Sequence, residues 1–381
     1  MSPNEQIDLP EFSGREVYFL VKLSFDMGLQ VLHTTAQVIC YTYKIFGKEP
    51  LEVMDTFKAL VLDKKGEQTN LDIKQLQKDD LPDGDLTIRV AYSSVNFKDG
   101  MVAVNNQLVE SYPLVPGIDL AGTVMGSQDN RFKEGDEVIV TSYELGTGHW
   151  GGFSEVARVP ADWAVPLPEG LSLKEAMILG TAGFTAGLSV QRLEDNGLER
   201  GQGSVLVAGA TGGVGSLAVN MLAKRGYDVT ASTGKSDEKD YLKKIGASEV
   251  VDRHEVEDTE QKPVRRKQWA AAVDPVGGKT LQYILSTLDY GGSVATSGLT
   301  GGTDVATSVL PFISRGINWL GIDSVKCPME KRRDVWQLLA DDFKPDMHDE
   351  LVNEVTLEEL PDVLRDIMES KVRGRTIVKL G

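Results

Sequence analysis

Apolar and polar positions alternate through the first part of the chain, from about residue 54 to residue 168. Leu86–Tyr92 has an apolar residue at every second position, which is the period of a strand with one buried face. Further short apolar runs, bounded by Gly, Pro or Asp, occur at Phe57–Asp63, Gly117–Thr123 and Glu137–Thr141. This pattern predicts a small, mostly β domain.

From about residue 172 the pattern changes to alternating helices and strands. Leu173–Val190 is rich in Ala, Gly and Leu and is long enough for a helix. Strands that alternate with helices predict a parallel, doubly wound sheet. The expected strands are Gly203–Ala208, Tyr227–Ser232, Glu249–Asp252, Ala270–Asp274 and Gly292–Gly298, and the expected helices are Val214–Arg225, Glu238–Ile245 and Lys279–Leu288.

The predicted fold class is therefore α/β with two domains. We expect the chain to return to the first domain after about Pro311 and to finish in the strand Arg375–Leu380. Residues 54–175 and 312–381 then form the mostly β domain, and residues 176–311 form the doubly wound domain.

Residues 1–53 do not share this pattern. The stretch Val17–Gly47 is fairly apolar, but Lys22, Asp26 and Lys44 interrupt it, whereas a membrane span needs about 20 mostly apolar residues. The acidic start, with Glu5 among its residues, is also unlike a secretory signal. We expect an N-terminal extension of unknown role, with three alternatives: a helical extension, a weak targeting leader, or upstream sequence that is not part of the mature protein.

Composition excludes several classes of protein. A net charge of −17 repels nucleic acid and anionic membranes, so neither is an expected partner; the alternative is that the charge serves solubility alone. Two cysteines, Cys40 and Cys327, allow at most one disulfide and no disulfide framework, which favours a reducing, cytoplasmic compartment. The four histidines are widely separated, and a catalytic zinc needs about three protein ligands. We therefore expect no metal.

The strongest local motif is a glycine-rich turn between an apolar strand and a helix. Val205–Ala208 runs directly into Gly209-Ala210-Thr211 and then into Gly212, Gly213, Val214 and Gly215. Glycines allow close approach of a pyrophosphate, and the free N–H groups of the helix N-terminus can bind it. With a complete βαβ unit around it, the turn predicts a dinucleotide site.

The end of the next strand indicates which dinucleotide binds. An acid there would mark NAD, but the sequence has Ser232, Thr233, Gly234 and Lys235. Hydroxyls and a lysine can bind a 2′-phosphate, and Arg253 at the tip of the following strand adds a second cation. NADPH is the predicted cofactor. The alternative is that Lys235 is a solvated surface lysine.

Motifs along the whole of Met54–Gly381 resemble the medium-chain dehydrogenase/reductase superfamily, and most closely its zinc-free acryloyl-CoA reductase and quinone oxidoreductase-like subfamily of the YhdH/YhfP type. The motifs that carry the resemblance are Ser93–Asp99, Pro116–Val124, Gly135–Val138, His149–Glu155, Gly180–Ala186, Tyr290–Gly292, Gly321–Val325 and Gly374–Thr376.

The resemblance implies a GroES-like catalytic domain beside a Rossmann domain, a small-molecule substrate in the cleft between them, and a homodimer joined through the Rossmann sheets. It implies further cofactor contacts at Phe97, Thr181, Leu299, Ile322, Asp323, Ser324 and Arg375. One departure is Phe97, since the subfamily usually has Tyr there. A phenyl ring can pack on the nicotinamide but cannot donate a proton.

The chemistry that fits is reduction of an activated C=C bond, in which hydride reaches the β carbon, donors stabilise the enolate and a proton reaches the α carbon. Asn96 is the first candidate to hold substrate or ribose, or else it braces its loop. Asp99 is a candidate proton relay, or else an N-cap or salt-bridge partner. Tyr143 is a candidate proton donor.

Three hypotheses follow from this chemistry. The first is an NADPH-dependent reductase of acryloyl-CoA or a similar short 2-enoyl thioester. The second is an NADPH quinone or enone oxidoreductase. The third, which rests on the departure at Phe97, is a non-catalytic NADPH-binding structural or regulatory protein.

Overall fold

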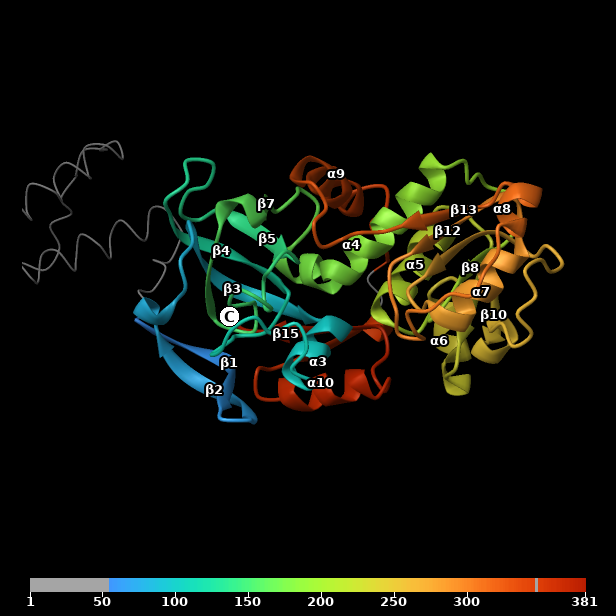
Figure 1. Ribbon diagram of the computed structural model, residues 1–381. Coiled ribbons are helices and arrows are strands. Elements are labelled where there is room, and N and C mark those ends of the chain that lie inside the picture. Colours follow the sequence, from blue (N-terminus) through green and yellow to red (C-terminus); the bar gives the residue numbers. More distant parts are fainter. Residues whose placement is uncertain (1–54, 347–348) are drawn as a thin grey trace, which may run out of the picture. The chain divides into compact units, whose positions relative to one another are not determined.

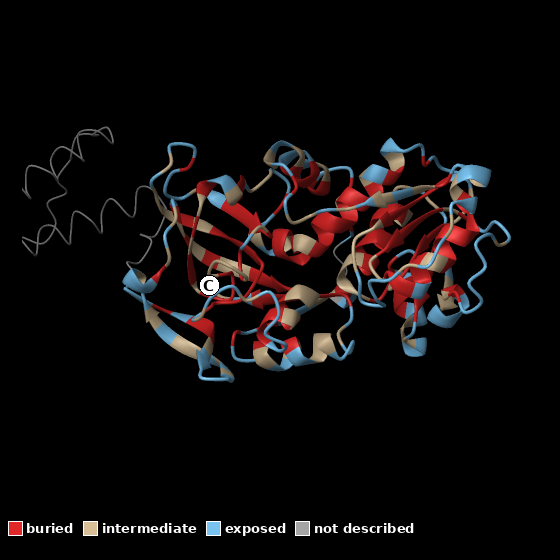
Figure 2. Ribbon diagram, viewed as in Figure 1, coloured by how far each residue is buried: buried red, intermediate tan, exposed pale blue. Residues whose placement is uncertain are grey.

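The computed structural model describes residues 55–346 and 349–381, and Met54–Gly381 forms one compact unit (Figure 1). The predicted extension at residues 1–53 lies outside the described residues. Strands of both large sheets are mostly buried, as Figure 2 shows in red. One buried core includes residues of both large sheets, among them Ala121, Ile377 and Val205.

The first large sheet has seven strands and is largely antiparallel. Its order is β14-β15-β3-β4-β5-β7, and β6 also pairs with β3. On β3 the residues Leu86, Ile88 and Val90 are fully buried, as the alternating pattern predicts. The strands are β3 (Leu86–Val95), β4 (Asp119–Ser127), β5 (Glu137–Thr141), β6 (Val156–Val159), β7 (Ala164–Pro166), β14 (Val352–Val355) and β15 (Arg375–Lys379).

An antiparallel hairpin precedes this sheet. β1 (Thr56–Lys65) matches a predicted strand, whereas β2 (Gln68–Gln77) was not expected, because most of its residues are polar. Leu71 on β2 lies directly opposite Leu62 on β1, so a few apolar side chains are enough to fix the register.

The second large sheet has six parallel strands in the order β10-β9-β8-β11-β12-β13, which is a Rossmann arrangement. Helices cover both faces. Val205 and Val207 of β8 pack in one core with α4 and α5, and Leu206 packs in another core with α7. The elements are β8 (Val205–Val207), α5 (Gly213–Lys224), β9 (Val229–Thr233), α6 (Lys239–Lys244), β10 (Glu249–Asp252), β11 (Trp269–Asp274), α7 (Gly278–Thr287), β12 (Leu288–Thr296), α8 (Leu310–Arg315) and β13 (Asn318–Gly321).

Strand β13 lies beyond residue 311, where we expected the doubly wound domain to end. It pairs with β12 from Asn318 to Gly321, so the Rossmann sheet includes this further strand. The signal was weak because only Trp319 and Leu320 of its four residues are apolar.

Helix α4 (Leu173–Asp195) begins with a capping box, in which Ser172 and Glu175 satisfy each other's backbone N–H groups. The helix is broken at Gly180, whose φ is +51° and ψ −156°. A Cβ atom there would lie 2.6 Å from a carboxylate oxygen of Asp119. Glycine is therefore required both by the backbone angle and by the close approach of Asp119.

Helix α8 was not predicted, and three further helices were also missed: α3 (Phe97–Ala103), α9 (Met329–Ala340) and α10 (Leu360–Met368). Leu360 and Leu364 of α10 pack in the same core as Ala103 of α3. Trp336 of α9 stacks on Phe184 of α4, with 6.0 Å between the ring centroids. Helices α3 and α10 cover apolar side chains of the seven-stranded sheet, and α9 covers those of α4.

Candidate active site

The glycine-rich turn connects β8 to α5 as predicted. Gly209 has a φ of +56°, and α5 begins at Gly213 with Gly212 as its N-cap. A Cβ on Gly215 would lie 2.7 Å from the Cα of Ala210, so the helix packs tightly on the turn. The N–H groups in the first turn of an α-helix have no carbonyl partner within the helix. In α5 these groups, which include that of Val214, can therefore bind a phosphate.

Predicted cofactor residues gather where the parallel strands end. Thr233 is the last residue of β9, Arg253 follows β10, Leu299 follows β12, and Ile322 follows β13. In a doubly wound sheet, ligands bind at this carboxyl edge. The pattern of strands thus brings residues far apart in sequence to the same edge as the glycine turn.

Hydroxyl and cationic side chains meet at the ends of β9 and β10. Thr233 accepts the backbone N–H of Lys235 at 3.1 Å and lies 3.3 Å from the Thr211 hydroxyl. A Cβ on Gly234 would lie 2.7 Å from Cδ of Arg253, so Arg253 crosses directly over this glycine. Ser232 is buried in the strand just before.

Lys235 is half-buried rather than freely solvated. Its Nζ donates to the carbonyl oxygen of Val372 at 2.7 Å, and burial lowers its pKa. The nearby Glu238 opposes this shift and pairs with Arg373 at 3.0 Å. The alternative of an ordinary surface lysine therefore does not describe Lys235.

The carboxylate of Asp119 is a buried centre of hydrogen bonds. From the described residues, Oδ2 accepts from Ser94 Oγ at 2.6 Å, from Asn96 Nδ2 at 2.7 Å and from the Thr181 backbone N–H at 2.8 Å. Oδ1 accepts from the Thr181 hydroxyl at 2.5 Å. Ser142 Oγ lies 3.1 Å from that hydroxyl. Asp119 thus joins two residues that were predicted separately, Asn96 and Thr181.

Asp99 is a second buried carboxyl group, on the first turn of α3. Its oxygens accept the backbone N–H groups of Asn96 at 2.7 Å and Ile118 at 2.8 Å. Burial and, next, the charge of Asp119 raise the pKa of Asp99 to about 7. Asn96 is the N-cap of α3, and Asp99, at the third helical position, completes its capping box, so the alternative that Asp99 is itself the N-cap is wrong. The raised pKa also allows Asp99 to exchange a proton near neutrality.

Arg375 is buried between the two domains' elements. Nε donates to the carbonyl of Ile178 at 2.8 Å and Nη1 to that of Val95 at 3.1 Å, while Nη2 has no hydrogen-bond partner among the described residues. A Cβ on Gly213 would lie 2.8 Å from Nη1. Arg375 therefore lies beside the glycine-rich turn and is not a surface cation.

Tyr143 follows β5 in a left-handed backbone conformation, with a φ of +52°. Its ring stacks on Trp163 at 5.7 Å between centroids, and its hydroxyl lies 3.5 Å from the Cys327 carbonyl oxygen. Its backbone N–H donates to the carbonyl of Val325 at 3.3 Å. The residue is held by packing on several sides.

The segment after β13 forms a compact turn. Asp323 Oδ1 accepts the backbone N–H groups of Val325 at 2.8 Å and Lys326 at 3.2 Å. The Ser324 carbonyl accepts from the buried Arg332 at 3.0 Å. Asp323 therefore shapes this turn.

Phe97, another predicted cofactor residue, is half-buried at the start of α3 and follows directly on Asn96.

Comparisons with known proteins match nearly all of the described part of the chain. Family models for the alcohol dehydrogenase GroES-like domain and for zinc-binding dehydrogenase match residues 82–169 and 213–341. The chain is 56% identical over 326 residues to the putative quinone oxidoreductase YhfP of Bacillus subtilis, covering 85% of this chain and 99% of YhfP. It is 48% identical to the acrylyl-CoA reductase AcuI of Ruegeria pomeroyi, covering 84% and 98%.

Solved structures show the same architecture. The crystal structure of YhfP with NAD bound has a TM-score of 0.83 and covers 85% of this chain and 99% of that one. The yhdH oxidoreductase from Salmonella enterica, in complex with NADP, has 42% identity and a TM-score of 0.83, covering 85% and 100%. The chain belongs to the medium-chain dehydrogenase/reductase superfamily of oxidoreductases. The GroES-like and Rossmann folds expected from the sequence are confirmed.

The name of one matching family model raises the question of zinc in this medium-chain dehydrogenase/reductase. Across residues 55–346 and 349–381, no group of three or more His, Cys, Asp or Glu side chains can hold a metal ion. His149 instead makes a 2.7 Å contact from its Nε2 to the Arg158 carbonyl. The described residues therefore do not fit a zinc centre with its three protein ligands.

Sequence reasoning missed Asp119 as a site residue. Its signal was available, because a carboxylate between Ile118 and Leu120 interrupts an apolar strand, and a buried charge needs partners. The sequence could not show which residues are its partners, since Ser94, Asn96 and Thr181 lie in other segments of the chain.

Proposed function

We propose that the protein is an NADPH-dependent reductase of an activated C=C bond, with acryloyl-CoA or another short 2-enoyl thioester as its substrate. The observation that carries this is the 48% identity to an acrylyl-CoA reductase across 98% of that relative's length. The polar cluster around Asp119, next to the glycine turn, also supports the proposal, because it contains side chains that can orient a substrate.

The chain's residues fit the dinucleotide. The N-terminus of α5 binds the pyrophosphate. Gly215 lets the helix lie close to the turn, since a Cβ there would lie 2.4 Å from the Gly209 carbonyl oxygen. Thr233, Lys235 and Arg253 bind the 2′-phosphate of the adenosine ribose, since hydroxyls and cations suit that group. NADPH supplies the hydride when it is bound.

The chain's own groups orient the substrate and stabilise the developing charge. One hydrogen of Asn96 Nδ2 is used by Asp119, which leaves the second for an enolate oxygen or a ribose hydroxyl. Asp99 holds Asn96 from the backbone side and can exchange a proton near pH 7. The proton for the α carbon comes from water or from a side chain, for which Tyr143 is the candidate.

Reduction of a quinone or enone is the second candidate function. The observation that favours it is the 56% identity to YhfP, which is named a putative quinone oxidoreductase. Both reactions use the same cofactor site, so they differ in whether a CoA moiety improves the rate.

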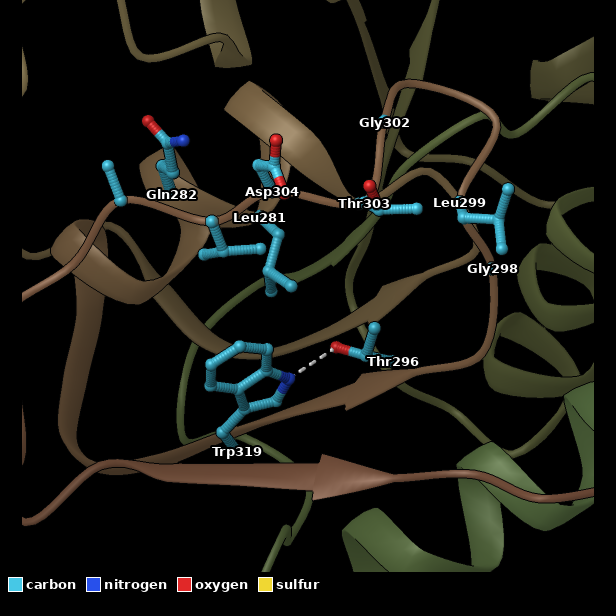
Figure 3. Close-up of a pocket in the computed structure, with 12 residues that line it drawn as sticks. Leu281, Gln282, Thr296, Gly298, Leu299, Gly302, Thr303, Asp304 and Trp319 are labelled. Carbon is cyan, nitrogen blue, oxygen red and sulfur yellow. Dashed lines mark hydrogen bonds between the residues drawn. The ribbon is translucent and has the colours of Figure 1, made fainter.

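We also propose a homodimer formed along β13, the outer strand of the Rossmann sheet. The segment around it exposes large apolar side chains: Ile313 is 75% exposed, Val309 67% and Trp319 43%. Figure 3 shows Trp319 in a pocket that Leu281 and Leu299 also line, with its indole N–H donating to Thr296. A second copy that pairs with the open edge of β13 would cover these groups.

No helix of the described residues is long and apolar enough to cross a membrane. A cytoplasmic location is our proposal, and it rests on the presence of only two cysteines in the sequence.

Steady-state rates with acryloyl-CoA and with 1,4-benzoquinone, each with NADPH and with NADH, test the proposal. We expect the highest kcat/KM for acryloyl-CoA with NADPH. Equal or higher efficiency with the quinone would favour the second function. Tight NADPH binding with no turnover of either substrate would instead support a non-catalytic protein.

A further inference from the structure

We propose that Asp119 is a positioning residue for the reduction, because it fixes the orientation of Asn96 and Thr181 toward the nicotinamide half of the cofactor. The inference rests on the proposed function and adds to it a residue that touches neither substrate nor cofactor. Asp119 is fully buried at the start of β4. It acts through the groups that surround it.

The cluster lies next to the phosphate-binding turn. Arg375, whose pKa is lowered by burial and raised by the charges of Asp119 and Asp99, has its Nη1 beside Gly213. Ala182, the neighbour of Thr181, lies 3.3 Å from the position of a Cβ on Gly213. The hydroxyls and cations at β9 and β10 define the adenosine side of the turn, so the Asp119 cluster lies on the nicotinamide side.

Asp119 determines which hydrogen bonds the Thr181 hydroxyl donates and which it accepts. The Thr181 hydroxyl carries one proton, and it donates that proton to Asp119 Oδ1 at 2.5 Å. Toward Ser142, at 3.1 Å, it can then act only as an acceptor. The carboxylate therefore sets a directed chain of hydrogen bonds from Ser142 through Thr181.

Asp119 also determines which way the amide of Asn96 faces. The amide nitrogen donates to Asp119 Oδ2 at 2.7 Å, and a flipped amide would place its oxygen against the carboxylate. Oδ2 accepts three donors, one of them the backbone N–H of Thr181, and Oδ1 accepts the Thr181 hydroxyl, so both oxygens of the carboxylate are engaged. An Asn side chain at position 119 would keep the shape but present a donor to some of these donors.

Ser94 provides a matched control. Its hydroxyl donates to the same Oδ2 at 2.6 Å, and the residue is fully buried. S94A removes one buried hydrogen bond from Asp119 while leaving the bonds to Asn96 and Thr181 intact. A role of Asp119 in stability alone predicts similar consequences for S94A and D119N.

The main experiment compares D119N, N96A, the double variant and S94A, with wild-type protein as reference. We expect D119N to lower kcat about 10- to 100-fold, as misplacement of reacting groups does. We expect N96A to lower it similarly and the double variant to add little, because Asp119 acts through Asn96. S94A should lower Tm but leave kcat within about 2-fold, which is less than 0.5 kcal/mol at 1.4 kcal/mol per factor of ten.

Additive losses in kcat, or equal effects of S94A and D119N, would overturn the inference. The fluorescence of bound NADPH is measured on the same variants without any substrate, so the positioning role can be judged even if no enoyl thioester is reduced. A shifted emission for D119N but not for S94A supports it. Identical spectra for all variants contradict it.

N96D keeps the test valid if D119N does not fold. Protonated, the new carboxyl can still donate to Asp119; ionised, it repels Asp119. The other charged groups at this point are Asp99 and Arg375, and because the Asn96 side chain lowers the pKa of Asp99, N96D also raises that pKa. We expect kcat of N96D relative to wild type to fall as pH rises from about 5 to 8, and a pH-independent ratio would refute the inference.

Discussion

The guanidinium of Arg332 lies over the ring of Tyr143, with 4.5 Å between Cζ and the ring centroid. The ring of Phe184 lies 4.8 Å from the same carbon. The fully buried Arg332 also donates to the carbonyls of Thr141 and Val325 at 3.2 and 3.1 Å. This cation therefore ties the end of β5 to the turn that follows β13.

Replacing Arg332 by Met tests that connection. R332M keeps much of the side chain's length but removes the donors to the carbonyls of Thr141, Ser324 and Val325, the first of them on a buried residue, and leaves the space between the Tyr143 and Phe184 rings without its cation. We expect it to destabilise the protein by about 2–4 kcal/mol. Urea unfolding measures the loss. R333M, at the neighbouring exposed position of α9, is the control and should change stability by less than about 0.5 kcal/mol.

Y143F separates the proton-donor hypothesis from a packing role. The phenyl ring of the variant can still stack on Trp163. The hydroxyl that is removed lies 3.5 Å from the Cys327 carbonyl oxygen in the wild-type protein. We expect kcat to stay within about 3-fold, whereas loss of a general acid typically costs 10²- to 10⁴-fold. Single-turnover rates with acryloyl-CoA decide between the two, and a drop of about 100-fold would assign the proton to Tyr143.

G213A tests the phosphate-binding turn. The new Cβ would lie 2.8 Å from Arg375 Nη1 and 3.3 Å from the Cβ of Ala182, so it obstructs the start of α5. We expect Kd for NADPH to rise at least about 10-fold, or about 1.4 kcal/mol. Fluorescence titration measures it. G126A on β4 is the control, because nothing lies within 4 Å of its added Cβ, and it should bind NADPH like the wild type.

K235A and R253A test the preference for the phosphorylated cofactor. Each removes a cation from the ends of β9 and β10, and a charge-assisted hydrogen bond contributes about 1.5–3 kcal/mol. We expect Kd for NADPH to rise roughly 10- to 100-fold while Kd for NADH changes little. K239A, on the exposed side of α6, should alter neither constant. Equal weakening of both cofactors would show that these cations do not meet the 2′-phosphate.

Stability near neutral pH should depend on Asp99. Its pKa is about 7 in the folded protein against an ordinary value of 3.8, so the folded state holds a proton that the unfolded state releases. Stability from this group is therefore present below about pH 4 and falls as pH rises to about 7. We expect the difference in unfolding free energy between wild type and D99N to change over this range. A constant difference between pH 4 and 7 would contradict the assignment.

I313D tests the proposed homodimer. A carboxylate on this 75% exposed side chain costs nothing in a monomer but is desolvated against a second copy. We expect sedimentation velocity to show a dimer for wild type and a monomer for I313D. V264D, at another exposed apolar position, is the control that should stay dimeric.

The pattern of apolar and polar residues correctly predicted those elements whose own residues show it clearly. The bounds of β5 and β10 match the predicted strands at Glu137–Thr141 and Glu249–Asp252, and the glycine turn stands where expected. Helix α10 was missed although Leu360, Val363, Leu364 and Ile367 have helical spacing, so this signal was readable.

Other features depend on distant residues and could not be read locally. The break at Gly180 exists because Asp119 and Ser94 occupy the space where a side chain would lie. The second of these partners comes from β3, far earlier in the sequence. Strand β2 is fixed by its pairing with β1 rather than by its own apolar content.

Strand β15 has a consequence for how the protein acquires activity. Arg375 bonds to the carbonyl of Val95 across 280 positions of sequence, and contacts of such separation form slowly. The nucleotide-binding strands, by contrast, come from neighbouring βαβ units. On dilution from denaturant we therefore expect circular dichroism to recover first and NADPH fluorescence to recover later, when β15 has paired with β3.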